Sequence, residues 1–248
     1  MPFSHAPEAP TSATESGTPR VVLVPPAGGS ALLRRLWSDA LVGRAQVTMP
    51  RTPKSAGGTL FDVARALADR TPREGRWVLI GHSLGGLIAF ETVRALEATR
   101  APLPERLIVM GSQPPTARSG RMFASVVDLD DDRLLDALVG MGAVDAALRQ
   151  HPMRKLFTPG IRADLRLLVS YTGTDEPVGV DLHTWHGTED LLAPPSLAVG
   201  WEAFTAARFS ARFFEGGHFF PTERVDEATE ALDLAPTATI GPLPEPVA

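Results

Sequence analysis

The sequence predicts an α/β fold in which helices cover both faces of a mostly parallel sheet. Short apolar runs of the kind that form buried strands alternate with longer segments of helical periodicity. Gly-rich turns follow several of these runs, which marks the points where strands end. Alternation of this kind is typical of a parallel sheet packed between two layers of helices.

The predicted elements follow one another along the chain with one interruption. Strands are expected at 20–24, 45–49, 76–81, 106–111, 180–186 and 208–215. Helical patterns fall near 31–42, 59–70, 84–98, 194–204 and 222–232. Between the fourth and fifth strands, residues 118–172 have helical periodicity and no strand pattern. We therefore expect an inserted helical lid at about 118–172, over the edge of the sheet.

Composition limits the classes of function. The chain has 248 residues, enough for one α/β domain with a substantial core. A net charge of −5 gives no basis for nucleic-acid binding. The sequence contains no cysteine, which removes disulfides and thiolate catalysis. Its six histidines lack the spacing of common metal sites, so we expect neither a metal nor a cofactor.

The two ends of the chain differ from the centre in composition. Residues 1–19 are rich in Pro, Ala, Ser and Thr, and residues 235–248 contain repeated prolines. Both segments are predicted to be disordered tails around a domain at 20–234. Neither a signal peptide nor a membrane span is apparent in the sequence, so we expect a cytoplasmic protein with no membrane partner, and we favour a monomer.

A serine occupies the corner between the third predicted strand and the following helix. The apolar run Trp77–Ile80 leads into Gly81-His82-Ser83-Leu84-Gly85, which has the spacing G-x-S-x-G. Glycine at both ends of this turn has no Cβ to collide with neighbouring backbone. The pattern predicts a nucleophile elbow that holds the Ser83 hydroxyl at the carboxyl edge of the sheet.

A nucleophilic serine needs a base and a group that orients the base. Asp190 lies in a turn after the strand 180–186, and His218 lies in a Gly-rich loop after the strand 208–215. The order Ser83, Asp190, His218 is that of the α/β-hydrolases, so the predicted fold is an α/β-hydrolase fold. We expect Ser83 to be the nucleophile, His218 the general base and Asp190 the carboxylate that orients it.

Other residues compete for two of these roles. Glu189, Asp181 and Asp175 remain possible partners of the base, although Asp190 has the best position after its strand. His183 and His186 precede Asp190 and so have the wrong order for the base.

Acyl transfer also requires donors for the oxyanion that develops at the carbonyl, and main-chain amides commonly supply them. One expected donor is the amide of Leu84, directly after the nucleophile. The other is the amide of Ala27, in the Gly-rich loop after the first strand. A phosphate-binding role for that loop is a weaker alternative, because neither common nucleotide pattern is present.

The chain resembles the stand-alone, or type II, thioesterases that accompany modular polyketide and nonribosomal peptide synthetases. Four stretches carry the resemblance: Pro25–Ser30, Gly81–Gly86, the segment Ile161–Leu168 together with Tyr171, and Gly216–Phe219. The elbow alone would specify only the superfamily. The run Arg162-Ala163-Asp164-Leu165 points to a smaller group of proteins than the elbow does, because unrelated esterases have no reason to carry it.

The resemblance implies a reaction and a partner. Family members hydrolyse acyl groups from the phosphopantetheine arm of acyl or peptidyl carrier proteins, for editing or release. By position, Ser83, His218 and Asp190 would form the triad, and Ala27 and Leu84 the oxyanion donors. The basic residues expected near the mouth would meet an acidic carrier or its phosphate, unless they are ordinary solvated side chains. They are Arg51, Lys54, Arg118 and Arg121.

Other functions stay open at this point. Where the family commonly has Pro-Gly-Arg, this chain has Met49-Pro50-Arg51, near the predicted rim of the site. A product-releasing hydrolase or a cyclase acting on a mature chain is therefore an alternative. A general carboxylesterase is a third possibility, since the fold supports many chemistries. A non-catalytic binding module is the least expected, because it has no need for nucleophile, base and acid together.

Overall fold

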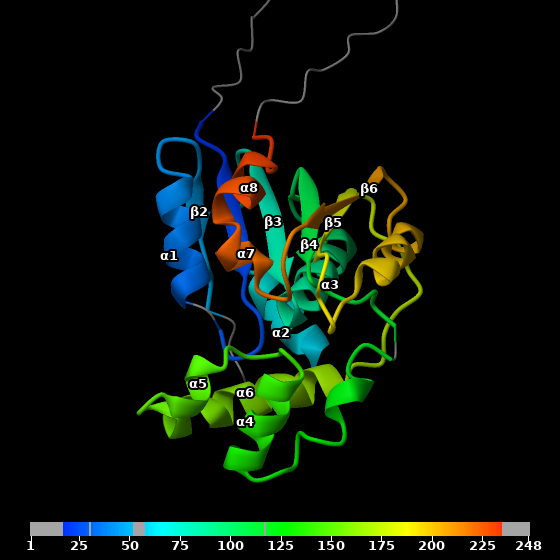
Figure 1. Ribbon diagram of the computed structural model, residues 1–248. Helices are drawn as coiled ribbons and strands as arrows, with labels where there is room; N and C mark the ends of the chain where they lie inside the picture. The colour runs from blue at the N-terminus through cyan, green and yellow to red at the C-terminus, as the bar shows by residue number, and fades with distance from the viewer. Residues whose placement is uncertain (1–16, 30, 52–57, 117, 235–248) are drawn as a thin grey trace, which may run out of the picture.

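The computed structural model describes residues 17–29, 31–51, 58–116 and 118–234 (Figure 1). Six parallel strands form one sheet in the order β2-β1-β3-β4-β5-β6. Their bounds are β1 Arg20–Val24, β2 Gln46–Thr48, β3 Trp77–His82, β4 Arg106–Met110, β5 Asp181–Gly187 and β6 Phe209–Phe214. The predicted parallel sheet is confirmed.

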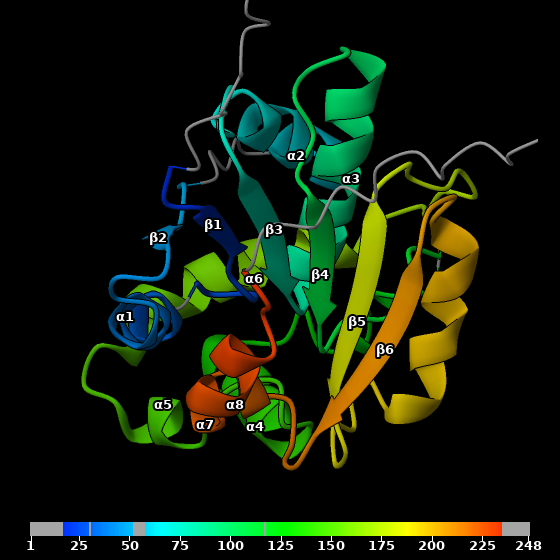
Figure 2. The same cartoon turned by 90° about the horizontal axis from the view of Figure 1, so that it is seen from above.

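Helices cover both faces of this sheet (Figure 2). The α-helices are α1 Ala31–Ala40, α2 Leu60–Ala68, α3 Leu84–Ala98, α4 Asp131–Gly140, α5 Ala147–Gln150, α6 Arg154–Val169, α7 Phe220–Glu223 and α8 Val225–Glu230. Two 3-10 helices are η1 Arg121–Phe123 and η2 Pro195–Phe204. The layers and the crossover order are those of the α/β-hydrolase fold.

The alternation of side chains along each strand builds two apolar layers. In β1, Val22 and Val24 pack with α2 and α3, whereas Val21 and Leu23 pack on the opposite face with α1, α7 and α8. All four side chains are nearly inaccessible to solvent. Since both faces of the strand are buried, its sequence reads as a continuous apolar run rather than an alternating one.

Two helical predictions differ from the structure in detail. The pattern at 194–204 forms the 3-10 helix η2. Gly200, within this segment, has low helix propensity, which disfavours a regular α-helix there. The pattern at 222–232 begins earlier, at Phe220, and is broken at Arg224, whose φ of −121° and ψ of 42° are not helical.

The lid segment, residues 118–172, contains η1, α4, α5 and α6 and, in its described part, no strand. Its α-helices gather at one end of the sheet (Figure 1). Tyr171, just after α6, donates a hydrogen bond of 2.6 Å to the buried Glu91 carboxyl on α3, to which Arg94 also donates. The pKa of Tyr171 is raised, chiefly by burial and to a smaller extent by the charge and hydrogen bond of the Glu91 carboxyl. This hydrogen bond fixes the C-terminal end of α6 to the core.

No helix in the described part of the chain is long and apolar enough to cross a membrane. The same residues hold no cluster of three or more His, Cys, Asp and Glu side chains that could bind a metal ion. The tails predicted at 1–19 and 235–248 lie largely outside the described residues. Of these two segments, the structure describes residues 17–19.

Candidate active site

Ser83 stands at the turn between β3 and α3 in a backbone conformation that few residues other than glycine adopt. Its φ is 56° and its ψ is −122°. A Cβ on Gly81 would lie 2.1 Å from the Gly85 carbonyl oxygen, and one on Gly85 would lie 2.2 Å from that of Val24. Both glycines are therefore required by the close crossing of backbone at this corner. From Gly81 to Phe90, Ser83 is the one residue that is not buried.

Asp190 and His218 form a buried hydrogen-bonded pair after the ends of β5 and β6. His218 Nδ1 lies 2.8 Å from Asp190 Oδ2. The other carboxylate oxygen, Oδ1, accepts hydrogen bonds from the amides of Leu192 at 2.9 Å and Ala193 at 3.0 Å. Asp190 is 1% exposed and His218 is 7% exposed. Both oxygens of the carboxylate are thus held, and the imidazole is oriented through Nδ1.

The pKa of Asp190 reflects these contacts. Burial alone raises it, but the hydrogen bond and charge of His218, together with the Leu192 and Ala193 amides, lower it further than burial raises it. The resulting pKa of Asp190 lies below the ordinary value of an aspartate, so Asp190 carries a negative charge at neutral pH. A charged carboxylate next to Nδ1 favours the imidazole tautomer that leaves Nε2 free to accept a proton.

The other carboxylates considered as partners of the base lie elsewhere. Asp181 is paired with Arg208 at 2.6 Å, and the side chains of Glu189 and Asp175 are exposed. Of the earlier histidines, His183 contacts the Ser210 hydroxyl. His186 is bound to the Thr184 hydroxyl and the Ala193 carbonyl. In the described part of the chain, Asp190 is the carboxylate that contacts His218.

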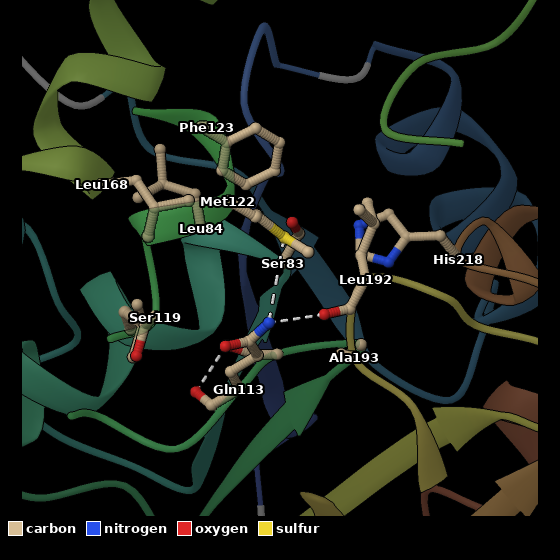
Figure 3. Close-up of a pocket in the computed structure, with 13 residues that line it drawn as sticks. Ser83, Leu84, Gln113, Ser119, Met122, Phe123, Leu168, Leu192, Ala193 and His218 are labelled. Atoms are coloured by element: carbon tan, nitrogen blue, oxygen red, sulfur yellow. Dashed lines mark hydrogen bonds between the residues drawn. The ribbon is translucent and has the colours of Figure 1, made fainter. Parts of the chain in front are cut away.

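Ser83 and His218 line the same cavity, whose volume is about 30 Å³ (Figure 3). Within the residues that the structure describes, no hydrogen bond joins the two side chains. Catalytic hydrogen bonds of this kind are often formed only when a substrate is bound. Gln113 lies on the wall of the cavity, where its side-chain amide donates to the Leu192 carbonyl at 2.7 Å.

Ala27 and Leu84 line a second cavity that also includes Ser83. Its volume is about 20 Å³, and its wall is apolar apart from Ser83. Among the described residues, neither the Ala27 amide nor the Leu84 amide donates a hydrogen bond to a protein acceptor. Leu84 is the first residue of α3, where amides have no partner within the helix. Both amides are therefore available to an acceptor in the cavity that Ser83 lines.

The residue before the nucleophile, His82, contributes to the site in a way that the sequence analysis did not identify. Its side chain is buried, and Nε2 lies 2.8 Å from the carbonyl oxygen of His218, to which it donates. Burial, with the nearby His218 imidazole adding to it, lowers the pKa of His82 to about 3. A neutral His82 therefore holds the loop that carries His218. In the sequence, the position of His82 next to Ser83 was the one feature that could have pointed to this role.

We predict that this buried histidine makes stability fall in mild acid. The ordinary pKa of histidine is 6.5 and that of folded His82 is about 3, so between these values the unfolded chain binds the extra proton. The stabilisation is complete above the unfolded pKa and is lost as pH falls below it, at up to about 1.4 kcal/mol per pH unit. Urea unfolding from about pH 7.5 to about pH 5 measures this slope.

The control for this prediction is a pair of single variants. His82→Gln should be less stable near neutrality and should depend less steeply on pH than the wild type. His151→Gln changes an exposed histidine and should keep the wild-type slope. If His82→Gln loses stability with the same slope as the wild type, His82 is not the group responsible.

The geometry above defines the class of protein as an α/β-hydrolase with a serine, a histidine and an aspartate at the carboxyl edge of its sheet. The thioesterase-domain family model matches residues 19–235, and the chain belongs to the thioesterase family. The fold described above agrees with this family and with the solved structures it resembles.

Three relatives support this assignment. Phenyloxazoline synthase MbtB of Mycobacterium tuberculosis is 30% identical over 86% of this chain, although the match spans 16% of that protein's length. The structure of RedJ, a thioesterase from the prodiginine biosynthetic pathway in Streptomyces coelicolor, is 26% identical with a TM-score of 0.76, and the match covers 94% of this chain and 90% of RedJ. BorB, a type II thioesterase from the borrelidin biosynthetic cluster, is 26% identical with a TM-score of 0.73, covering 92% and 94%. The predicted family is confirmed.

Proposed function

We propose that the protein is a serine thioesterase that hydrolyses acyl groups from the phosphopantetheine arm of acyl or peptidyl carrier proteins. The reaction would serve editing or release in polyketide or nonribosomal peptide biosynthesis. One observation carries the proposal: Ser83, on a strained elbow, lines the same cavity as His218. The Nδ1 atom of His218 is hydrogen-bonded to the buried Asp190. The biosynthetic pathways named for RedJ and BorB support the choice of substrate class.

In the first half of this mechanism, Ser83 Oγ attacks the thioester carbonyl carbon and His218 Nε2 takes the hydroxyl proton. The carbonyl oxygen becomes an oxyanion that accepts hydrogen bonds from the amides of Ala27 and Leu84. The C–S bond then breaks, the proton on His218 passes to sulfur, and the free thiol of the arm leaves. Asp190 stabilises the imidazolium throughout. The product of this half is an acyl ester of Ser83.

In the second half, water replaces the thiol. His218 takes a proton from water, the resulting hydroxide equivalent attacks the ester carbonyl, and the same two amides bind the new oxyanion. Collapse breaks the bond to Ser83 Oγ, which regains a proton from His218. The free carboxylic acid and the original enzyme are the products.

The cavity lined by Ala27 and Leu84 is the proposed acyl site. Its remaining wall is apolar: Pro26, Phe123, Leu138, Ala143, Val144, Ile161, Leu165, Leu168 and Leu192. A volume of about 20 Å³ is close to the space taken by one or two water molecules on the same scale. Such a site would accept a short acyl group without displacement of the lid segment. This size favours hydrolysis of short chains over cyclisation of a mature product.

The proposed carrier partner would approach beside η1. Arg118 and Arg121 are exposed, and the residues between and after them, Ser119 and Met122, line the cavity that contains His218. In the described part of the chain neither guanidinium has a carboxylate partner. Two unpaired cations at this position suit the arm's phosphate or an acidic carrier. Arg51 is also exposed, whereas Lys54 lies outside the described residues. A cytoplasmic location belongs to the same proposal.

The proposal predicts faster release from a carrier than from small substrates. A panel of acyl groups would be loaded on a carrier protein, on a small thiol and on a simple alcohol, and released acid would be measured by mass spectrometry. We expect the highest kcat/KM for short acyl groups on the carrier. Equal turnover of the oxygen esters would indicate a general carboxylesterase, and a ring as main product from a long hydroxylated chain would indicate a cyclase.

A double variant isolates the carrier contact. Arg118→Ala with Arg121→Ala should raise KM for the acyl-carrier substrate several-fold and leave kcat/KM for the small thioester unchanged. The matched control replaces Arg34 and Arg35, two exposed arginines on α1, and should leave both values at wild type. Unchanged KM in the Arg118/Arg121 variant would remove these side chains from carrier binding.

A further inference from the structure

The helix α6 of the lid segment contacts the loop that carries Ala27 through one buried carboxylate. Asp164 Oδ2 accepts a hydrogen bond of 2.7 Å from the Gly28 amide, across 136 positions in sequence. Asp164 is 3% exposed. One helical turn earlier, Ile161 packs so closely on the same loop that a Cβ on Gly28 would lie 2.8 Å from its Cγ1. The loop is therefore both bonded to α6 and packed against it.

The loop at this point is a tight turn whose central peptide has two alternative orientations. The Gly29 amide donates to the Pro26 carbonyl at 2.9 Å, which closes a four-residue turn over Pro26–Gly29. Gly28, at the third position, has a φ of +83°, the value of a type II turn. A type I turn has the same end-to-end hydrogen bond with its central peptide rotated by about half a turn.

The hydrogen bond from Gly28 selects one of these orientations. Its N–H belongs to the central peptide, between Ala27 and Gly28, and a rotated peptide would turn the Ala27 carbonyl toward the Asp164 carboxylate instead. Two oxygen acceptors facing each other in a buried site are unfavourable. Asp164 thus favours the type II form. The Ala27 amide belongs to the preceding peptide, whose orientation is the same in both turn types. Asp164 therefore acts on this amide by holding the turn Pro26–Gly29 in place against α6.

We propose that Asp164 is a positioning residue for the oxyanion site: it fixes the turn Pro26–Gly29 and thereby the Ala27 amide. This inference rests on the proposed function of the site. Oxyanion stabilisation depends on donors that are oriented before the reaction, because reorientation during the reaction costs free energy. Since Asp164 belongs to α6, the placement of the lid segment and the readiness of the oxyanion site are linked.

Two substitutions at Asp164 separate its chemistry from its bulk. Asp164→Asn keeps an oxygen that can accept from the Gly28 amide, whereas Asp164→Leu fills similar space with no acceptor. We expect Asp164→Leu to lower kcat for the acyl-carrier substrate about 10-fold to 100-fold, which is less than complete removal of an oxyanion donor would cost. KM should change little, and Asp164→Asn should restore most of kcat.

A second readout is independent of turnover. An alkylboronic acid forms a tetrahedral adduct with a reactive serine and places an oxygen where the oxyanion develops. Its affinity should fall in Asp164→Leu by the same factor as kcat/KM, and recover in Asp164→Asn. This comparison also separates two failures. Absence of thioester hydrolysis by the wild type would overturn the proposed function, and equal boronic-acid affinity in all three proteins would overturn the role of Asp164.

Matched variants guard against a general loss of folding. Thr158→Val removes a fully buried hydroxyl from the same helix, and should leave kcat at wild type. If Asp164→Leu fails to fold, Gly28→Ala tests the same turn, because it opposes both the φ of Gly28 and the contact with Ile161. It should lower kcat far more than Gly43→Ala, a glycine with a φ of +75° and open space around it. Equal effects of the two glycine variants would contradict the inference.

Discussion

Replacement of Ser83 by alanine should lower kcat/KM for an acyl-carrier thioester by about 10⁴-fold or more, because the acyl-enzyme can no longer form. The substitution removes one oxygen from a residue that is not buried and leaves the elbow glycines in place. The fold should therefore be retained. Release of acid from the loaded carrier, measured under single-turnover conditions, gives the loss directly.

The control for this variant is Ser38→Ala, which removes a hydroxyl from α1 that donates only to the carbonyl one turn earlier. Its activity should equal that of the wild type. Near-normal turnover by Ser83→Ala would exclude Ser83 as the nucleophile. Residual acceleration above the uncatalysed rate is expected in any case, since the amides of Ala27 and Leu84 remain.

Asp190→Asn should be almost as damaging, with a loss in kcat on the order of 10³-fold to 10⁴-fold. The contacts of the carboxylate give the reason. Oδ1 accepts from two amides, of Leu192 and Ala193, so the oxygen of an asparagine would be held there. Its NH₂ group would then take the place of Oδ2 and face His218 Nδ1. Because an NH₂ group is a donor, the imidazole would present Nδ1 as an acceptor and carry its proton on Nε2.

That tautomer cannot take the proton of Ser83 through Nε2. The fold should survive, because the two amide contacts are kept and only the orientation of one proton changes. The value of kcat at neutral pH measures the prediction. Wild-type kcat in Asp190→Asn at neutral pH would show that Asp190 does not set the tautomer. Glu189→Gln, an exposed neighbour, is the matched control.

Much of this site was predictable because parallel strands end at one edge of a sheet. Ser83, Asp190 and His218 follow β3, β5 and β6, so their approximate neighbourhood follows from strand direction alone. The elbow is local in sequence, and its two glycines identify it before any tertiary contact is known. Helix α3 was predicted with its observed bounds, since its apolar pattern starts directly after Ser83.

Other contacts could not be predicted from the sequence. The hydrogen bond between Asp164 and Gly28 joins segments 136 positions apart. The sequence analysis singled out Asp164 as part of the run Arg162–Leu165, but nothing in that run indicated a contact with the first loop. The burial of Asp164 depends on how α6 packs on the first loop. The contact of His82 with the His218 carbonyl likewise depends on how a loop returns to the elbow. Such pairings arise from tertiary packing, and local sequence propensities carry no information about it.

The most direct test of the account is the mass of the covalent intermediate. Wild-type protein and Ser83→Ala would be mixed with a short-chain acyl carrier, quenched rapidly and digested. We predict that the peptide containing Ser83 gains the mass of the acyl group less one hydrogen, and that Ser83→Ala gains nothing. An acyl group on a different residue, or turnover by the wild type with no acylated peptide at any time, would contradict the central claim.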